Sequence, residues 1–378
     1  MEAGAGEADA LGRLPDSIAD GMRQAGVMRM LQPREHGGYE ADPVSFLETV
    51  METARHCGAA GWVAGVVGVH PWEMAMCDPK VQGEVWGADQ DTWIASPYAP
   101  IGRARPVDGG FMFSGRFPFS SGTDHCKWVF LGGMVTDAEG VPLDPPDVRH
   151  FILPREDYVI DQESWDVVGL RGSGSKDVVV KDAFVPEYRT MEAAKVIDGR
   201  AAREAGRDEP LYRTPWSAIF PPAITASIIG IAEGAMATHI NYQRERLGLM
   251  VGRVVEDPYT MAAIGEAASE VNASRVQMLS NTARIFDLVD RGQEVPFELR
   301  AQGRRDQVRS CWRAVEAIDK VFSYAGGSAL QMSLPLQRFW RDAHAGLNHA
   351  VHVSGGVYAT YANVAMGNNV DNAFKMTI

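Results

Sequence analysis

The chain has 378 residues, 46% hydrophobic and 22% charged, which is enough for a large core with two or three subdomains. Its formal net charge of −13 argues against nucleic-acid binding and against docking on anionic membranes, because both need a cationic face. No basic start leads into an apolar run, and the longest strongly apolar stretch, residues 59–69, is too short to span a bilayer. The four cysteines form no C-x-x-C pair, so we expect a reduced, cytoplasmic protein.

Residues 1–90 are predicted to form an N-terminal helical domain. Asp42-Pro43 supplies a cap and a first-turn proline, and the apolar residues after it follow the spacing of one helical face. Residues 59–77 are rich in Gly, Ala, Val and Trp, which predicts a tightly packed helix near a ligand or a second helix.

Residues 91–195 are predicted to form a central β domain, because short apolar runs alternate with turn signals. The runs at 111–119, 127–135, 151–153, 158–160 and 177–180 suggest a small sandwich or barrel. Residues 197–210 are charged and helix-poor, so we expect a linker or mobile loop there.

Residues 196–378 are predicted to form a C-terminal helical bundle of four helices. Helical patterns cover 225–247, 258–288 and 297–324, and a last one runs from 335 to 366. The order of helices, strands and helices predicts an α+β fold.

Two polar, glycine-containing segments in the β domain are candidates for a ligand site. Residues 115–125 contain the turn Ser120-Ser121-Gly122, whose hydroxyls and amides can bind the edge of a flat heterocycle. Residues 164–177 contain a Gly-Ser-Gly-Ser run that is neither a Walker loop nor a dinucleotide fingerprint. On composition, an ordinary polar turn is the better explanation of residues 115–125 and an equally good explanation of residues 164–177.

A third candidate is the late helical segment 338–352. If the helix is continuous, Asp342 and His349 share one face, because seven residues make about two turns. A histidine of near-neutral pKa suits deprotonation of a phenol, although structural histidines are commoner. His344, His349 and His352 lack a carboxylate that would complete a helical ligand set, so we expect no metal site.

These segments together resemble the acyl-CoA dehydrogenase superfamily over about residues 15–367. Residues 165–177 are similar to its W-x-x-x-G-x-R-G-T/S-G-S motif, and Val185-Pro186 to the V-P pair that follows. Residues 242–246 resemble its Y-x-x-x-R segment, Gly326-Gly327 its flavin-contacting glycines, and Arg341-Asp342 its late R-D-A helix.

The chain departs from the dehydrogenases where they carry a catalytic glutamate. Here residues 347–351 contain His349 and no carboxylate. Together with Phe119-Ser120-Ser121-Gly122, this resembles the two-component flavin monooxygenase branch, which includes the oxygenase components for 4-hydroxyphenylacetate and for 3-hydroxy-9,10-seco-steroids.

The resemblance implies hydroxylation of a phenolic or other aromatic, possibly polycyclic, substrate. Reduced FMN or FAD would come from an NAD(P)H-dependent flavin reductase, O₂ would add at flavin C4a to give a hydroperoxide, and the enzyme would be a homotetramer. His349 would deprotonate the phenol with Asp342 orienting it, and Ser120 or Ser121 would bind near flavin N5. The remaining residues implied to contact the flavin are Trp62, Ser96, Phe119, Arg244, Arg246, Gly327 and Ser328.

Three alternatives stay open at this point. Within the same fold, the chain could N-hydroxylate an amino compound, or act as an acyl-CoA dehydrogenase that uses another base. Outside catalysis, it could be a non-catalytic flavin-fold or scaffold protein.

Overall fold

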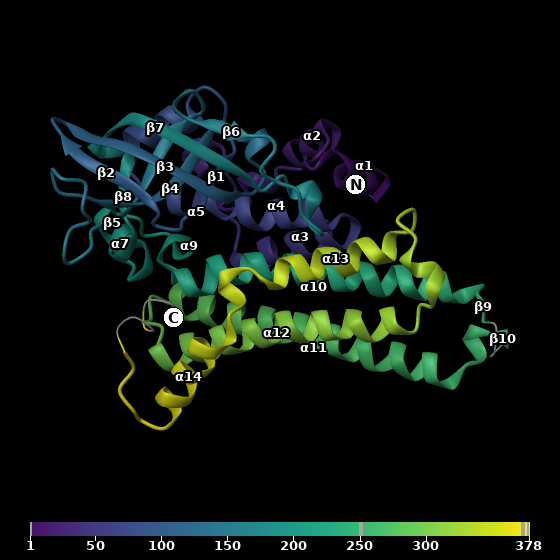
Figure 1. Ribbon diagram of the computed structural model, residues 1–378. Helices are drawn as coiled ribbons and strands as arrows, with labels where there is room; N and C mark the ends of the chain where they lie inside the picture. Colours follow the sequence, from purple (N-terminus) through teal and green to yellow (C-terminus); the bar gives the residue numbers. More distant parts are fainter. Residues whose placement is uncertain (1, 249–251, 372–374, 376–377) are drawn as a thin grey trace.

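The computed structural model describes residues 2–248, 252–371, 375 and 378. Helices come first, a sheet follows, and helices return (Figure 1), which confirms the predicted α+β class. The division into domains at residues 90 and 195 stays a prediction, because element order alone does not define folding units. The principal elements are α1 (Ala5–Leu11), α2 (Asp16–Gln24), α3 (Pro43–His56), α4 (Gly58–Gly68), α5 (His70–Met74), α6 (Pro79–Trp86), β1 (Ile94–Ala95), β2 (Gly102–Val107), β3 (Gly110–Ser120), β4 (Trp128–Val135), β5 (Val148–Pro154), β6 (Val159–Asp161), β7 (Lys176–Pro186), β8 (Thr190–Glu192), α7 (Ala193–Ile197), α8 (Arg200–Glu204), α9 (Pro210–Arg213), α10 (Trp216–Arg244), β9 (Leu247–Gly248), β10 (Gly252–Arg253), α11 (Pro258–Asp290), α12 (Phe297–Ser323), α13 (Pro335–Leu347) and α14 (Ser354–Ala365).

Helix α4 is the tightly packed helix that its composition predicts. All its residues are buried, and it packs against α3 and α10. A Cβ added at Gly61 would lie 2.1 Å from Ala54 Cβ, and one at Gly65 would lie 2.4 Å from the carbonyl oxygen of Ala223. The glycines therefore allow α4 to approach both neighbours more closely than larger residues would.

Strands β1 to β8 form one eight-stranded sheet, and β9 pairs with β10 in a separate two-stranded sheet. The order of the larger sheet is β6-β7-β3-β2-β4-β5-β8, with β1 pairing to β4. The pairs β1–β4 and β2–β4 are parallel and the others are antiparallel. Parallel pairing of β1 with β4 sets Ile94 opposite Trp128, so the segment after β1 runs beside the middle of β4.

Helix α10 begins nine residues before the predicted start at 225, because it continues through Pro221 and Pro222. Prolines usually end a helical pattern, but here the hydroxyl of Thr225 donates to the carbonyl oxygen of Pro221. By length and composition α10 could cross a membrane, so 59–69 is not the longest apolar stretch. However, 94% of its most apolar window is buried against other elements, as in a core helix.

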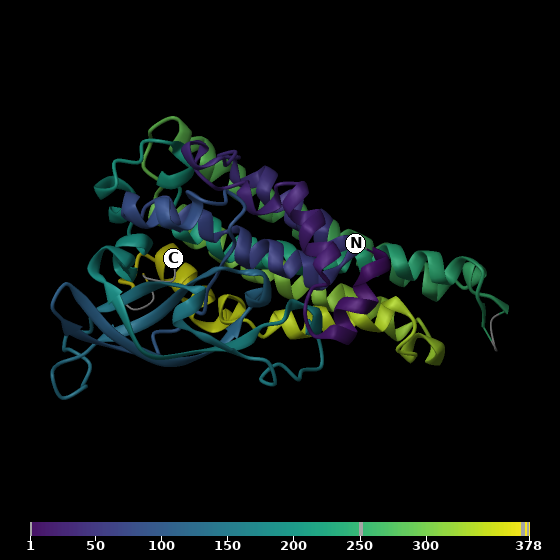
Figure 2. The same ribbon diagram turned by 90° about the horizontal axis from the view of Figure 1, so that it is seen from above.

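Two further predictions about helices are wrong. Residues 197–210 are not helix-poor, because α8 lies there with Ala201 and Ala202 buried. The last helix is not continuous either: α13 ends at Leu347, and a 3-10 turn at Ala350–His352 precedes α14. In both views the end of the bundle that carries β9 and β10 projects away from the sheet (Figures 1 and 2).

Candidate active site

Three predicted site residues from distant parts of the sequence meet in the structure. Trp62 on α4 donates from Nε1 to Ser121 Oγ over 3.1 Å. The rings of Trp62 and His349 lie edge to face, with centroids 5.7 Å apart. Trp62 and Ser121 are buried, and His349 is partly buried. The end of β3, the middle of α4 and the turn after α13 therefore converge on one place.

A chain of hydroxyls behind Ser121 fixes the direction of its hydrogen bond. The hydroxyl of Ser173 donates to the carbonyl oxygen of Leu170 over 2.7 Å, so Ser175, 2.7 Å away, must donate to Ser173. Ser121, 2.7 Å from Ser175, must then donate to Ser175. Because each hydroxyl has one hydrogen, Ser121 can only accept from any further group, as it already accepts from Trp62.

The end of β3 leaves buried polar atoms for a bound group. The hydroxyls of Ser120 and Thr123 are buried and have no hydrogen-bond partner in the described part of the chain. Buried hydroxyls are rarely left unpaired, so their lack of partners fits a ligand with polar edges. Phe119 beside them has a left-handed backbone, with φ of 65°, and the residue is 68% exposed. The residues present therefore fit a flat heterocycle such as flavin.

His349 is a neutral hydrogen-bond donor in this arrangement. Its Nδ1 accepts from the backbone N–H of Val351 over 3.2 Å, so in the neutral ring Nε2 carries the hydrogen. Burial lowers the pKa of His349 to about 4, which keeps the ring neutral near pH 7. A protonated Nε2 cannot accept a phenolic proton, so the geometry favours donation over the deprotonating role that the resemblance implies.

Asp342 does not share a helical face with His349, because α13 ends between them. Its Oδ1 accepts from the backbone N–H of Leu170 over 2.6 Å. Burial raises the pKa of Asp342 to about 7. The neighbouring Arg341 donates to the carbonyl oxygen of Val168 and pairs with Asp9. These bonds anchor the 168–170 loop to α13. Asp342 therefore holds this loop and, contrary to the prediction, does not orient His349.

Ser96 lies in a second polar cluster that the sequence did not reveal. Its hydroxyl oxygen is 2.6 Å from Nε2 of His70, and the hydroxyl of Tyr98 is 3.1 Å from Nδ1 of the same ring. Tyr98 donates to Glu73 over 2.7 Å, and Nδ1 of His150 is 2.5 Å from the other Glu73 oxygen. Burial, and then the nearby His150 ring, lower the pKa of His70 to about 3.

Helix α10 contacts both the His70 ring and the His352 ring next to His349. Phe220 lies 6.3 Å, ring to ring, from His70. Thr225, five residues later, lies 2.9 Å from Nε2 of His352, whose ring is 6.2 Å from that of His349. Five residues of helix span about 7.5 Å. The His70 cluster and the His349 cluster therefore both contact the same stretch of α10.

The four remaining predicted residues lie at the other end of the bundle. Arg246 donates to the carbonyl oxygen of Tyr324, next to Gly327 and Ser328, which are exposed together with Arg244. About 29 Å of helix separate Thr225 from Arg244, at 1.5 Å per residue. Among the contacts of residues 2–248 and 252–371, none joins this group to Trp62, Ser121 or His349.

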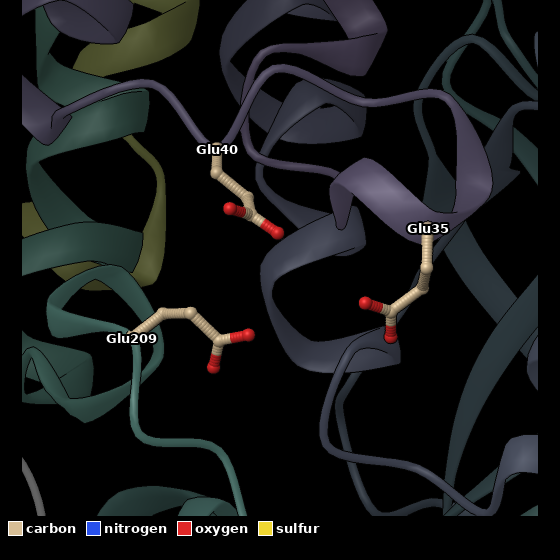
Figure 3. Close-up of side chains that lie close together, drawn as sticks. All are labelled: Glu35, Glu40 and Glu209. Atoms are coloured by element: carbon tan, nitrogen blue, oxygen red, sulfur yellow. The ribbon is translucent and has the colours of Figure 1, made fainter.

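Three carboxylates at the surface could hold a cation by their spacing alone. Oxygens of Glu35, Glu40 and Glu209 lie within 4.8 Å of one another (Figure 3). Arg207 lies 2.7 Å from Glu35 and 3.6 Å from Glu209, and Arg34 lies 3.2 Å from Glu40. Since arginines already neutralise these carboxylates, we assign no metal to this cluster.

A surface cavity of about 410 Å³ lies beside α6, β5 and α8, and no histidine of either cluster lines it. Its cationic side chains are each paired with carboxylates, and they are Arg149, Lys195 and Arg207. No free charge remains among them to attract an ionic ligand.

Comparison with known proteins agrees with this geometry. Residues 223–354 match the family described as "Acyl-CoA dehydrogenase, C-terminal domain". The chain is 55% identical to a pigment production hydroxylase of Rhodococcus erythropolis, over 93% of this chain and 90% of that one. It is 42% identical to the oxygenase subunit HsaA of a flavin-dependent monooxygenase of Rhodococcus jostii, over 96% and 94%. The crystal structure of 3-HSA hydroxylase from Rhodococcus sp. RHA1 superposes with a TM-score of 0.92 at 41% identity, covering 99% of this chain and 95% of that one.

Proposed function

Because this chain belongs to the oxygenase components of flavin-dependent monooxygenases built on the acyl-CoA dehydrogenase fold, we propose that it hydroxylates a phenolic substrate with reduced flavin and O₂. When bound, reduced flavin supplies the electrons that activate O₂. The protein would orient the flavin and the substrate and exclude water from them.

The direction of the serine chain is the observation that carries this proposal. Ser121 can only accept a further hydrogen bond, because its own hydrogen points to Ser175. A reduced flavin ring has an N–H at N5, whereas the oxidised ring has a bare nitrogen there. Ser121 therefore suits the reduced cofactor, with Ser120, Trp62 and the exposed residue Phe119 around it.

The two histidine clusters would have different roles in the reaction. His349 would donate from Nε2 to an oxygen near the flavin, since its Nδ1 is occupied by Val351. The Ser96 hydroxyl and Nε2 of His70 would bind the hydroxyl of the substrate, since they bond to each other and not directly to a carboxylate. A deprotonated phenol is electron-rich at the ring carbon that is to be oxygenated, which is why a proton acceptor assists the reaction.

We further propose that a second copy of the chain completes the flavin site. Arg244, Arg246, Gly327 and Ser328 lie about 29 Å along α10 from the His352–Thr225 contact, too far to hold the same ring. They suit a flavin phosphate that is bound across a subunit boundary, as in the homotetramer we expect. A cytoplasmic location fits the four buried free cysteines, and reduced flavin would come from a separate NAD(P)H-dependent reductase.

The test is product analysis with reduced FMN or FAD, isotopically labelled O₂ and a panel of phenols. We expect one labelled oxygen in the product, only when reduced flavin is present. Reduction of an electron acceptor by an acyl-CoA, or an oxygen found on nitrogen with an amine substrate, would replace the proposal with one of the alternatives. Absence of product from every phenol would reject it.

A further inference from the structure

We propose that Tyr98 and Glu73 extend the Ser96–His70 pair into a proton relay, in which Glu73 receives the proton of the substrate hydroxyl. The inference rests on the proposed function, because it needs a hydroxyl-bearing substrate at Ser96. It assigns roles to Tyr98, Glu73 and His150, three residues that hold no other place in the site.

The direction of each hydrogen bond follows from the carboxylate at the end. An ionised Glu73 can only accept, so it accepts from the Tyr98 hydroxyl over 2.7 Å and from His150 Nδ1 over 2.5 Å. Tyr98 has one hydrogen, so its oxygen must accept from Nδ1–H of His70 over 3.1 Å. Nε2 of His70 is then bare and accepts from the Ser96 hydroxyl over 2.6 Å.

These hydrogen bonds leave one acceptor position free, a lone pair on the Ser96 oxygen. A substrate hydroxyl that donates there can lose its proton in four linked transfers. The proton moves to the Ser96 oxygen, the Ser96 hydrogen moves to His70 Nε2, the Nδ1 hydrogen moves to Tyr98, and the Tyr98 hydrogen moves to Glu73. One O–H bond of the substrate breaks, one O–H bond of Glu73 forms, and the electron pair stays on the substrate oxygen.

His70 changes tautomer in this sequence and never becomes a cation. That agrees with its surroundings, because burial among apolar rings lowers its pKa to about 3 and would oppose a lasting positive charge. An imidazole that transfers a proton from one side to the other needs one bare and one protonated nitrogen. The hydrogen bonds of His70 to Ser96 and Tyr98 fix that arrangement.

His150 and the surrounding rings hold the end of the relay in place. The His150 ring stacks on Tyr98 with centroids 4.2 Å apart, and Glu73 is only 2% exposed. The groups that face the Glu73 carboxylate are Tyr98, His150 and the ring of His70 behind Tyr98, while the Cys77 thiol bonds to its backbone oxygen. The proton therefore stays inside the protein and can return to the same oxygen after hydroxylation.

The hydrogen-bond directions are tested first on flavin-free protein with ¹⁵N-labelled histidine. NMR identifies which nitrogen of His70 is protonated. We expect Nδ1–H in the wild type and Nε2–H in Tyr98→Phe, which removes the acceptor at Nδ1. Tyr188→Phe is the matched control, because the Tyr188 hydroxyl donates to Glu84, at 2.8 Å, and not to Glu73. A wild-type His70 protonated at Nε2, or an unchanged tautomer in Tyr98→Phe, would overturn the proposal.

The destination of the proton is tested by Glu73→Gln, which keeps the shape of the side chain but has no carboxylate. We expect single-turnover hydroxylation to slow about 100-fold, the usual scale for an acid–base group, with flavin affinity unchanged and Glu84→Gln at the wild-type rate. Hydroxylation by Glu73→Gln at the wild-type rate would overturn the proposal, even if Tyr98→Phe fails to fold. If the wild type hydroxylates no phenol, the proposed function fails, while the NMR measurement still decides the hydrogen-bond directions.

Discussion

The two ends of the candidate site each carry a neutral histidine, and the Nε2 atom donates a hydrogen bond in one ring and accepts one in the other. His349 has Nδ1 occupied by the backbone N–H of Val351, so its Nε2 donates. His70 has Nδ1 beside Tyr98, which is committed to Glu73, so its Nε2 accepts from Ser96. Burial lowers the pKa of both rings, and it is the partner of the second nitrogen that separates their roles.

A histidine in a buried polar site is therefore not a base by default. The Nε2 atom of histidine is a donor where a backbone amide bonds to Nδ1, and an acceptor where Nδ1 bonds to a tyrosine that donates to a glutamate. The variants below test whether the two rings differ as their hydrogen bonds indicate.

The largest effect is expected for His70→Asn. Loss of the acceptor behind Ser96 should slow hydroxylation about 100-fold or more, within the usual range for an acid–base group. Single-turnover product formation after mixing with reduced flavin and O₂ measures it. His344→Asn is the control, because the His344 ring bonds to Asp319 at the surface of α13. Equal rates in both variants would remove His70 from proton transfer.

Ser175→Ala should change which flavin the chain prefers. Without its acceptor, the Ser121 hydroxyl can turn and donate to the bare N5 of oxidised flavin, so the ratio of oxidised to reduced Kd should fall about tenfold, the scale of one hydrogen bond. Fluorescence titration of oxidised flavin and anaerobic titration of reduced flavin give the ratio. Ser114→Ala, at an exposed hydroxyl bonded to Asp182, should leave it unchanged, and an unaltered ratio in Ser175→Ala would contradict the directed chain.

His349→Asn should have a smaller effect. An Asn oxygen can still accept from Val351 N–H, so the turn is kept, while the donor at Nε2 is lost. We expect product formed per O₂ consumed to fall about threefold to tenfold, as for one lost hydrogen bond. Peroxide release against product yield measures it, and a wild-type yield would show that the donor is not used.

The same variant should lessen the sensitivity of the fold to acid. The pKa of His349 is about 4 when folded and about 6.5 when unfolded, so between these values the unfolded chain binds the extra proton. Stability is therefore full above pH 6.5 and falls as the pH drops towards 4, by about 1.4 kcal/mol per pH unit for this group. Unfolding of His349→Asn should show a correspondingly shallower fall, and an identical pH dependence would mean that His349 is not held neutral.

Much of the fold is readable from the sequence because it depends on local patterns. Capping at Asp42, the small residues of α4 and the turn-bounded strands all act within a few neighbours. The errors fall where distant contacts override a local rule. Helix α10 runs through Pro221 and Pro222 because residues 217–232 of it are all buried, and α8 forms because Ala201 and Ala202 are buried.

The amino-acid sequence is sufficient to predict the α+β order, the family resemblance and the candidates Trp62, Ser121 and His349, which the fold brings together. The folded chain is needed to see which of these groups donate and which accept hydrogen bonds, that Asp342 is separate from His349, and that His70 and Glu73 lie in one cluster with His150. The one local signal for this cluster was the three-residue spacing of His70 and Glu73 in a short helix. The hydrogen bonds that fix a tautomer or carry a proton link residues up to 77 positions apart, and no periodicity along the chain records such a pairing.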